Sequence, residues 1–200
     1  MTSTQEAKKI VQSLLDKGVK HFCTDWDLTA LKIHTSETIL RPPYAVDMDS
    51  SDWKTCTEMD VSKNVRPGRE PCLAHFANPA LFKEVITECL AQGIKVYIMS
   101  FGFRALICKY VEALFGKDQT IFTDANVFTP SNFGGYTDFC SMGNKLAMLA
   151  KVVVADKATV ALFDDGESII EGAKEAGYIH SVWVPEDHQP GLSGVEKYFN

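Results

Sequence analysis

The sequence of 200 residues lacks several features that mark particular classes of protein. It has no run of about 18 uncharged apolar residues, which a membrane-spanning helix needs. Residues 1–15 have no apolar core of a secretory signal peptide. A basic stripe, which is typical of nucleic-acid binders, is also missing, and the formal net charge is -6. We therefore expect a cytoplasmic protein that binds neither a membrane nor a nucleic acid.

The cysteines lack the spacing of a metal site, a disulfide framework or a catalytic loop. No two of them form a CxxC pair. None is followed six positions later by arginine, so the loop of cysteine-based tyrosine phosphatases is absent. Several lie in apolar runs, which predicts buried, reduced thiols. The six are Cys23, Cys56, Cys72, Cys89, Cys108 and Cys140.

The sequence does contain a regular alternation of predicted strands and helices. A helix opens the chain and ends at Gly18. The other predicted helices cover 79–92, 103–115, 142–153 and 166–176, and the predicted strands cover 19–24, 94–99, 120–122, 159–163 and 181–184. This alternation predicts parallel strands joined by right-handed crossovers. We expect one α/β domain over 1–200, a three-layer α/β/α sandwich around a Rossmann-like parallel sheet.

Polar residues follow the predicted strands at the edge where open parallel sheets bind ligands. They are Asp25 and Asp27 after the first strand, Ser100 after the second, Asp164 and Asp165 after the fourth, and Lys145 early in a helix. Each alone has an ordinary explanation as a turn former, a helix cap or a solvated side chain. Together, carboxylates at two strand ends would repel each other without a cation, and Mg²⁺ favours carboxylates and phosphate oxygens. The set therefore predicts a magnesium and phosphate site.

These residues, in this order, resemble the motifs of the haloacid dehalogenase (HAD) superfamily. The run Asp25-Trp26-Asp27-Leu28-Thr29 matches its DxDxT motif, although Trp26 is bulkier than the usual residue. Ser100, Lys145 and the pair Asp164-Asp165 match the other three motifs. The resemblance covers most of the chain, and it implies an HAD-like fold without a full cap domain.

The resemblance also implies a role for each residue of the site. Asp25 is the nucleophile that forms an aspartyl-phosphate, and Asp27 is the general acid and base. Thr29 steadies the Asp27 loop and is one of the substrate-binding residues. Mg²⁺ is held by Asp25, by the backbone carbonyl of Asp27, by Asp165, and by Asp164 directly or through water. The phosphoryl oxygens are bound by Ser100, by Lys145 and by the amides near Phe101 and Gly102.

Asp27 favours hydrolysis of a phosphate monoester over dehalogenation, because an alkoxide or phenoxide leaving group gains from protonation and a halide leaves without it. The expected substrate is a phosphoprotein, including phosphotyrosine, or a small phosphorylated metabolite. A phosphomutase, which needs a larger cap, ranks low. Two alternatives remain, a receiver-type signalling domain and a catalytically silent HAD-like module. We expect a monomer or a small homo-oligomer.

Residues 30–78 form the segment in which a cap would be inserted. Proline, glycine and polar residues punctuate this segment, which predicts an elaborated flap rather than a folded domain. Side chains that could face the substrate from it are Tyr44, Trp53 and Arg41, Arg66 or Arg69.

Overall fold

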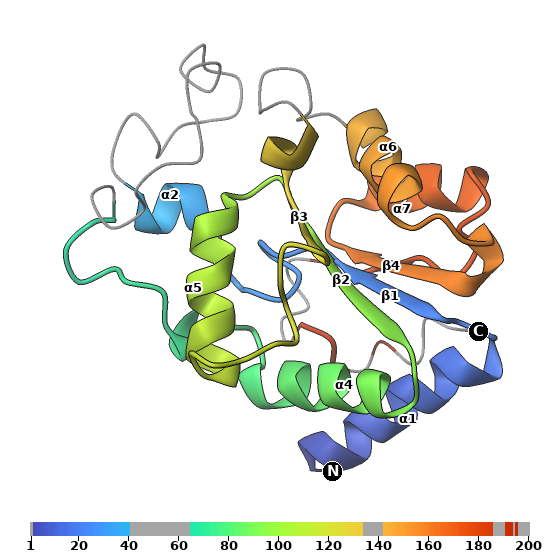
Figure 1. Cartoon of the computed structure of the whole chain (residues 1–200), viewed down its shortest axis with the longest axis horizontal. Helices are drawn as coiled ribbons and strands as arrows, with labels where there is room; N and C mark the ends of the chain where they lie inside the picture. The colour runs from blue at the N-terminus through green and yellow to red at the C-terminus, as the bar shows by residue number, and fades with distance from the viewer. Residues whose placement is uncertain (1, 41–64, 134–141, 186–190, 194, 196–200) are drawn as a thin grey trace.

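The computed structural model describes residues 2–40, 65–133, 142–185, 191–193 and 195 (Figure 1). Its helices are α1 (Ser3–Asp16), α2 (Thr35–Ile39), α4 (Pro79–Ala91), α5 (Arg104–Phe115), α6 (Met142–Val152) and α7 (Glu167–Glu175), with short 3-10 turns at Leu73–His75, Pro130–Phe133 and Lys157–Thr159. Its strands are β1 (His21–Thr24), β2 (Lys95–Met99), β3 (Val127–Phe128), β4 (Val160–Asp164) and β5 (Val182–Trp183).

The five strands form one sheet in the order β3-β2-β1-β4-β5, and all neighbouring pairs are parallel. The predicted α/β class and parallel sheet are thus confirmed. The order reverses direction at β1, because the chain moves from β1 outward to β3 and then crosses back to β4 on the other side. Such a switch point opens a crevice at the carboxyl ends of the strands. Cys23 is paired with Tyr97 of β2 and with Leu162 of β4, so β1 lies at the centre.

Alternating side chains of the strands pack into two apolar layers, one on each face of the sheet. In β1, Phe22 belongs to the layer that also contains residues of α1, α4 and α5. Its neighbour Cys23 belongs to the layer that contains Met148 of α6 and Ile170 of α7. Figure 1 displays the same division, with α6 and α7 on the opposite side of the strands from α1 and α4. Helices therefore cover both faces, as the sequence predicts.

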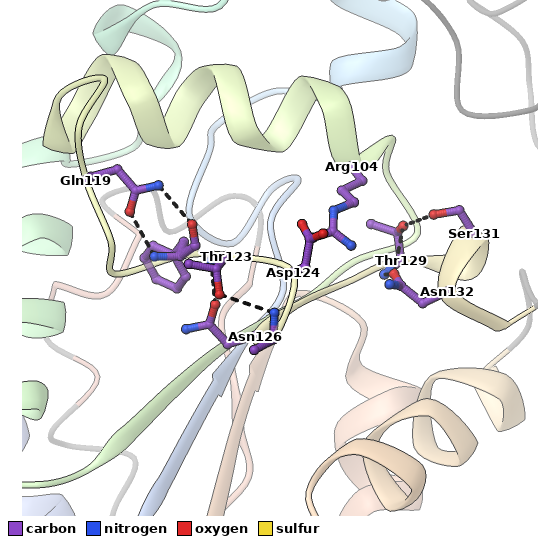
Figure 2. Close-up of polar contacts among 10 residues, drawn as sticks. Arg104, Gln119, Thr123, Asp124, Asn126, Thr129, Ser131 and Asn132 are labelled. Atoms are coloured by element: carbon purple, nitrogen blue, oxygen red, sulfur yellow. Dashed lines mark hydrogen bonds and ion pairs between the residues drawn. The ribbon is translucent and has the colours of Figure 1, made fainter.

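The predicted strand over 120–122 is wrong, because those residues lie in a loop and the third strand is Val127–Phe128. Figure 2 shows the side chains that shape this loop. The Gln119 amide donates to the Phe122 carbonyl and accepts from the Phe122 N–H, both at 2.8 Å. The Asn126 amide donates to the carbonyl of Ile121 at 2.7 Å and accepts from the N–H of Thr123. These side chains take the main-chain groups that a strand would use for its ladder.

The segment between β1 and α4 begins and ends as two stretches that lie side by side. Leu31 forms an antiparallel bridge with Phe76, and Leu40 forms another with Val65. These bridges join the start and the end of the predicted flap, whose residues 41–64 lie outside the described part. We call the described stretches, 30–40 and 65–77, the flap stem.

Two further expectations can be compared with the described residues. Cys23 and Cys89 are buried as predicted, Cys108 is half-buried, and all are free thiols. Cys72 is exposed, so the prediction of a buried thiol is wrong there, because it lies in the irregular flap stem and not under a helix. Cys56 and Cys140 lie outside the described residues. Within the described ranges, no helix has the length and apolar character needed to cross a membrane.

Candidate functional site

The two acidic motifs meet at the switch point of the sheet. Asp25 directly follows β1, and Asp164 is the last residue of the neighbouring strand β4. The N–H of Asp25 donates to the Phe163 carbonyl at 2.8 Å, so the ladder holds the two strand ends together. Both aspartates are buried, with 7% and 1% of their surface exposed. Parallel pairing thus brings together residues that are far apart in the sequence.

Lys145 lies between these two aspartates and forms an ion pair with each. Its Nζ is 2.8 Å from Asp25 Oδ1 and 2.7 Å from Asp164 Oδ2. The lysine is itself 2% exposed, and it lies in the first turn of α6. A cation there opposes the helix dipole, but here it is paired with two buried carboxylates. The predicted proximity of Lys145 to the acids is therefore found in the structure.

Burial dominates the protonation equilibria of this group. It raises the pKa of Asp25 from 3.8 to about 6, although Lys145 acts in the opposite direction. It also raises the pKa of Asp164 to about 6 against the same opposing charge. For Lys145, burial lowers the pKa, but the charges of Asp164 and Asp25 outweigh it and hold the pKa above its ordinary range. The lysine stays protonated and offsets only part of the negative charge.

Asp165 adds a third carboxylate to the cluster. One carboxylate oxygen from each of Asp25, Asp164 and Asp165 lies within 4.8 Å of the others, a spacing that allows them to hold one metal ion. Burial and the charge of Asp164 raise the pKa of Asp165. One lysine thus faces three close acids, and a divalent cation would balance the remaining charge.

Two contacts fix Asp165, and one of them differs from expectation. The Thr29 hydroxyl donates to Asp165 Oδ1 at 3.1 Å and so steadies Asp165, whereas the expected role was to steady the Asp27 loop. The indole N–H of Trp183 donates to the Asp165 carbonyl at 2.8 Å. Thr29 is fully buried and its hydroxyl is used, which argues against its predicted contact with substrate. Trp183 carried no signal in the sequence, because its partner is a main-chain atom.

Asp27 is half-buried, and Thr35 holds its carboxylate. Both the N–H and the hydroxyl of Thr35 donate to Asp27 Oδ2, each at 2.9 Å. The other oxygen, Oδ1, is buried without a hydrogen-bond partner in the described part of the chain. Burial raises the pKa of Asp27 to about 6, while the two Thr35 hydrogen bonds oppose the change. Thr35 belongs to none of the predicted motifs, and its only signal in the sequence is a hydroxyl residue at the start of a short helical pattern.

The turn that carries both aspartates has an unusual backbone. Leu28 has a φ of 54°, in the left-handed region that L-amino acids rarely adopt. The N–H groups of Ala30 and Leu31 donate to the Trp26 carbonyl, which closes the turn. Asp25 on one side of the turn is paired with Lys145, and Asp27 is hydrogen-bonded to Thr35.

The loop after β2 reaches the same site. Ser100 is buried, and its Oγ accepts a hydrogen bond from the Gly102 N–H at 2.9 Å. A Cβ at Gly102 would lie 3.1 Å from Ser100 Oγ and 3.8 Å from Thr35 Oγ1, so this loop packs against the flap stem. The Phe101 ring lies 5.2 Å from Lys145 Nζ, a cation–π contact. The Gly102 N–H, which was predicted to bind a phosphoryl oxygen, donates to Ser100 Oγ in this structure.

Trp26, between the two aspartates, points away from them into an aromatic cluster. Its ring packs edge-on against Phe76, Phe82 and Tyr110, with centroids 5.7 to 6.1 Å apart. The Tyr110 hydroxyl is 2.6 Å from His75 Nδ1, so the cluster is tied to the flap stem. The bulky residue in the DxDxT-like run therefore anchors the turn in the core.

The flap residues expected to face the substrate are only partly described. The Nε of Arg66 donates to the Leu40 carbonyl, so this arginine holds the flap stem together. Arg69 is exposed. Arg41, Tyr44 and Trp53 lie outside the described residues.

No family model matches this sequence, and no curated protein matches it.

Proposed function

We propose that this chain is a magnesium-dependent phosphate-monoester phosphatase of the HAD type, which acts through an aspartyl-phosphate on Asp25. The observation that carries the proposal is the buried group at the end of β1 and β4. There Lys145 is paired with Asp25 and Asp164, and Asp165 is close enough to share a ligand with them. Buried charges that only partly cancel are costly to a fold, and perturbed carboxylates in such a position are typical of functional sites.

The donor set fits magnesium. The oxygens of Asp25, Asp164 and Asp165 are hard ligands, and they already lie within 4.8 Å of one another. These carboxylates, with the main-chain carbonyl of Asp27, would hold the ion. When bound, Mg²⁺ supplies positive charge that neutralises the acids and the phosphoryl oxygens.

Asp25 is the residue best placed to attack phosphorus. Lys145 touches its Oδ1, so a phosphoryl group next to Asp25 would lie within reach of a permanent cation. The carboxylate forms a bond to phosphorus while the bond to the leaving oxygen breaks, and a water molecule later hydrolyses the aspartyl-phosphate. Lys145 stays positively charged throughout, because the charges of Asp164 and Asp25 outweigh burial and keep the pKa of the lysine above its ordinary range.

Asp27 is the candidate for proton transfer. It lies two residues from Asp25 on the same turn, and its Oδ1 has no hydrogen-bond partner among the described residues. It would give a proton to the leaving oxygen and then take one from the attacking water. This role favours esters with poor leaving groups, such as phosphoproteins or small phosphorylated metabolites.

The strand order bears on the receiver alternative. Receiver-type domains have the order 2-1-3-4-5, whereas this sheet has the order β3-β2-β1-β4-β5. The difference argues against a receiver. It leaves the catalytically silent module as the alternative that an assay must separate.

Hydrolysis of p-nitrophenyl phosphate, with and without MgCl₂, tests the proposal. We expect turnover that requires the metal, and Asp25→Asn should lower it by more than about a thousandfold. Asp118→Asn is the matched control, because Asp118 is an exposed acid in the loop after α5. Absence of metal-dependent turnover in the folded wild-type protein would contradict the proposal. Substantial activity in Asp25→Asn would contradict Asp25 as the nucleophile.

A further inference from the structure

The carboxylate of Asp27 has two oxygens in different environments. Oδ2 accepts hydrogen bonds from both the N–H and the hydroxyl of Thr35, each at 2.9 Å. Oδ1 is buried, and no group in the described ranges hydrogen-bonds to it. A buried polar atom without a partner is rare in proteins, and it indicates a ligand, a water molecule or a functional role.

From this asymmetry we propose that Thr35 is a positioning residue for proton transfer, which holds Oδ2 of Asp27 so that Oδ1 faces the leaving oxygen of the substrate. The inference rests on the proposed phosphatase function. It adds a residue that matches none of the four sequence motifs and that belongs to the flap stem.

The hydrogen bonds also determine which oxygen carries the transferred proton. An oxygen that accepts two hydrogen bonds has little capacity to hold a proton as well. The proton therefore resides on Oδ1, which gives it to the leaving oxygen as the bond from that oxygen to phosphorus breaks. The electron pair of that bond stays on the leaving oxygen, and Asp25 forms the new bond to phosphorus.

The surroundings of Thr35 fit a role inside the site. Thr35 is 2% exposed, although it begins a helix of only five residues in an irregular segment. Its Oγ1 is 3.8 Å from the position that a Cβ of Gly102 would occupy, in the loop after β2. Thr35 thus connects the flap stem, the Asp27 turn and the Ser100 loop. A simpler explanation is that Asp27 only stabilises the start of α2, and the experiment must separate the two.

The leaving group provides the required readout. p-Nitrophenolate leaves without protonation, whereas the alkoxide of 2-glycerol phosphate needs a proton. A defect in general-acid positioning therefore lowers kcat/KM for the alkyl ester more than for the aryl ester. A purely structural defect lowers both alike.

Thr35→Val removes the hydroxyl and nearly preserves the shape of the side chain, and Thr35→Ser restores a hydroxyl. Thr38→Val is the matched control, because Thr38 is a half-buried threonine in the same short helix. We expect Thr35→Val to lower the alkyl-to-aryl ratio of kcat/KM by about tenfold, since a positioned acid contributes about 10²–10⁴-fold and the Thr35 amide remains. Thr35→Ser should recover most of the ratio, and Thr38→Val should leave it unchanged.

An unchanged ratio in Thr35→Val, or an equal loss on both esters, would overturn the role of Thr35. Thr35→Ala gives the same comparison if the valine variant does not fold. The activity of the wild-type protein separates the phosphatase function from the positioning role of Thr35. If it hydrolyses neither ester with MgCl₂, the phosphatase function fails, whereas turnover of both with an unchanged ratio in the variants refutes only the positioning role.

Discussion

Replacement of Lys145 by methionine should expose the electrostatic cost of the site. The change keeps a long side chain in the first turn of α6, but it leaves Asp25 and Asp164 without their shared cation. Removing one partner of a buried ion pair costs about 3–5 kcal/mol, because an uncompensated charge remains. We expect a loss of this size in the free energy of unfolding at pH 7.5 without divalent metal.

The loss should depend on pH in a defined direction. Burial raises the pKa of Asp25 from 3.8 to about 6 even with Lys145 present, and loss of the lysine raises it further. A carboxyl whose pKa is higher in the folded state favours folding when protonated, and that contribution disappears as the pH rises through the folded pKa. The wild-type shift is common to both proteins, so only the further rise in the pKa of Asp25 enters the comparison. The penalty of Lys145→Met should therefore be smaller at pH 5, where Asp25 is mostly protonated in both proteins, than at pH 7.5.

Urea denaturation followed by circular dichroism at both pH values measures these quantities. Lys174→Met is the control, because Lys174 is an exposed lysine on the neighbouring helix α7. The double variant Lys145→Met with Asp164→Asn removes one of the two carboxylates that lose their cation. It should recover part of the lost free energy of unfolding. If Lys145→Met costs no more than the control, or the same at both pH values, the reasoning about a buried charge group is wrong.

Two further predictions address the metal and the fold. MgCl₂ should raise the melting temperature at pH 7.5 and much less at pH 5. The pKa values of Asp25 and Asp164 are about 6, so at pH 5 both carboxyls are mostly protonated and bind metal poorly. An equal rise in melting temperature at the two pH values would contradict a carboxylate site. Asn126→Leu should cost about 2–3 kcal/mol in urea denaturation, since the side chain donates to two main-chain carbonyls and accepts from one amide. Asp124→Asn, at an ion pair with Arg104 in which the aspartate is exposed, should change stability by less than about 0.5 kcal/mol. Similar effects of Asn126→Leu and Asp124→Asn would contradict the importance of the Asn126 hydrogen bonds.

The class of fold could be predicted because local pattern and global architecture agree. Apolar runs such as 94–99 are strands at nearly the predicted bounds, since both of their faces are covered by helices. The exception was the third strand. Residues 120–122 look like a strand by composition, but the side chains of Gln119 and Asn126 capture their main-chain groups. The periodicity of apolar residues does not predict such hydrogen bonds between side chains and the main chain.

The members of the site were easier to predict than their partners. Asp25 and Asp164 come together because neighbouring parallel strands end at one edge. Lys145 reaches both of them from the first turn of α6. The contacts of Thr29 and Thr35 depend on the left-handed turn at Leu28, which a sequence pattern does not specify. The sequence therefore predicted which residues gather, and the structure revealed which atoms they use.

The unfavourable features of this chain are concentrated in a few residues of one edge. Leu28 adopts a backbone conformation that costs of order 1–3 kcal/mol, and it lies between Asp27 and Thr29. Asp25, Asp27 and Asp164 are acids whose burial raises their pKa values to about 6. A fold under selection for stability alone would favour apolar side chains of similar volume at such positions, because replacing a buried ionic group in this way is often neutral or stabilising. Under the proposed function, a strained turn beside partly compensated buried charge serves binding and chemistry rather than folding.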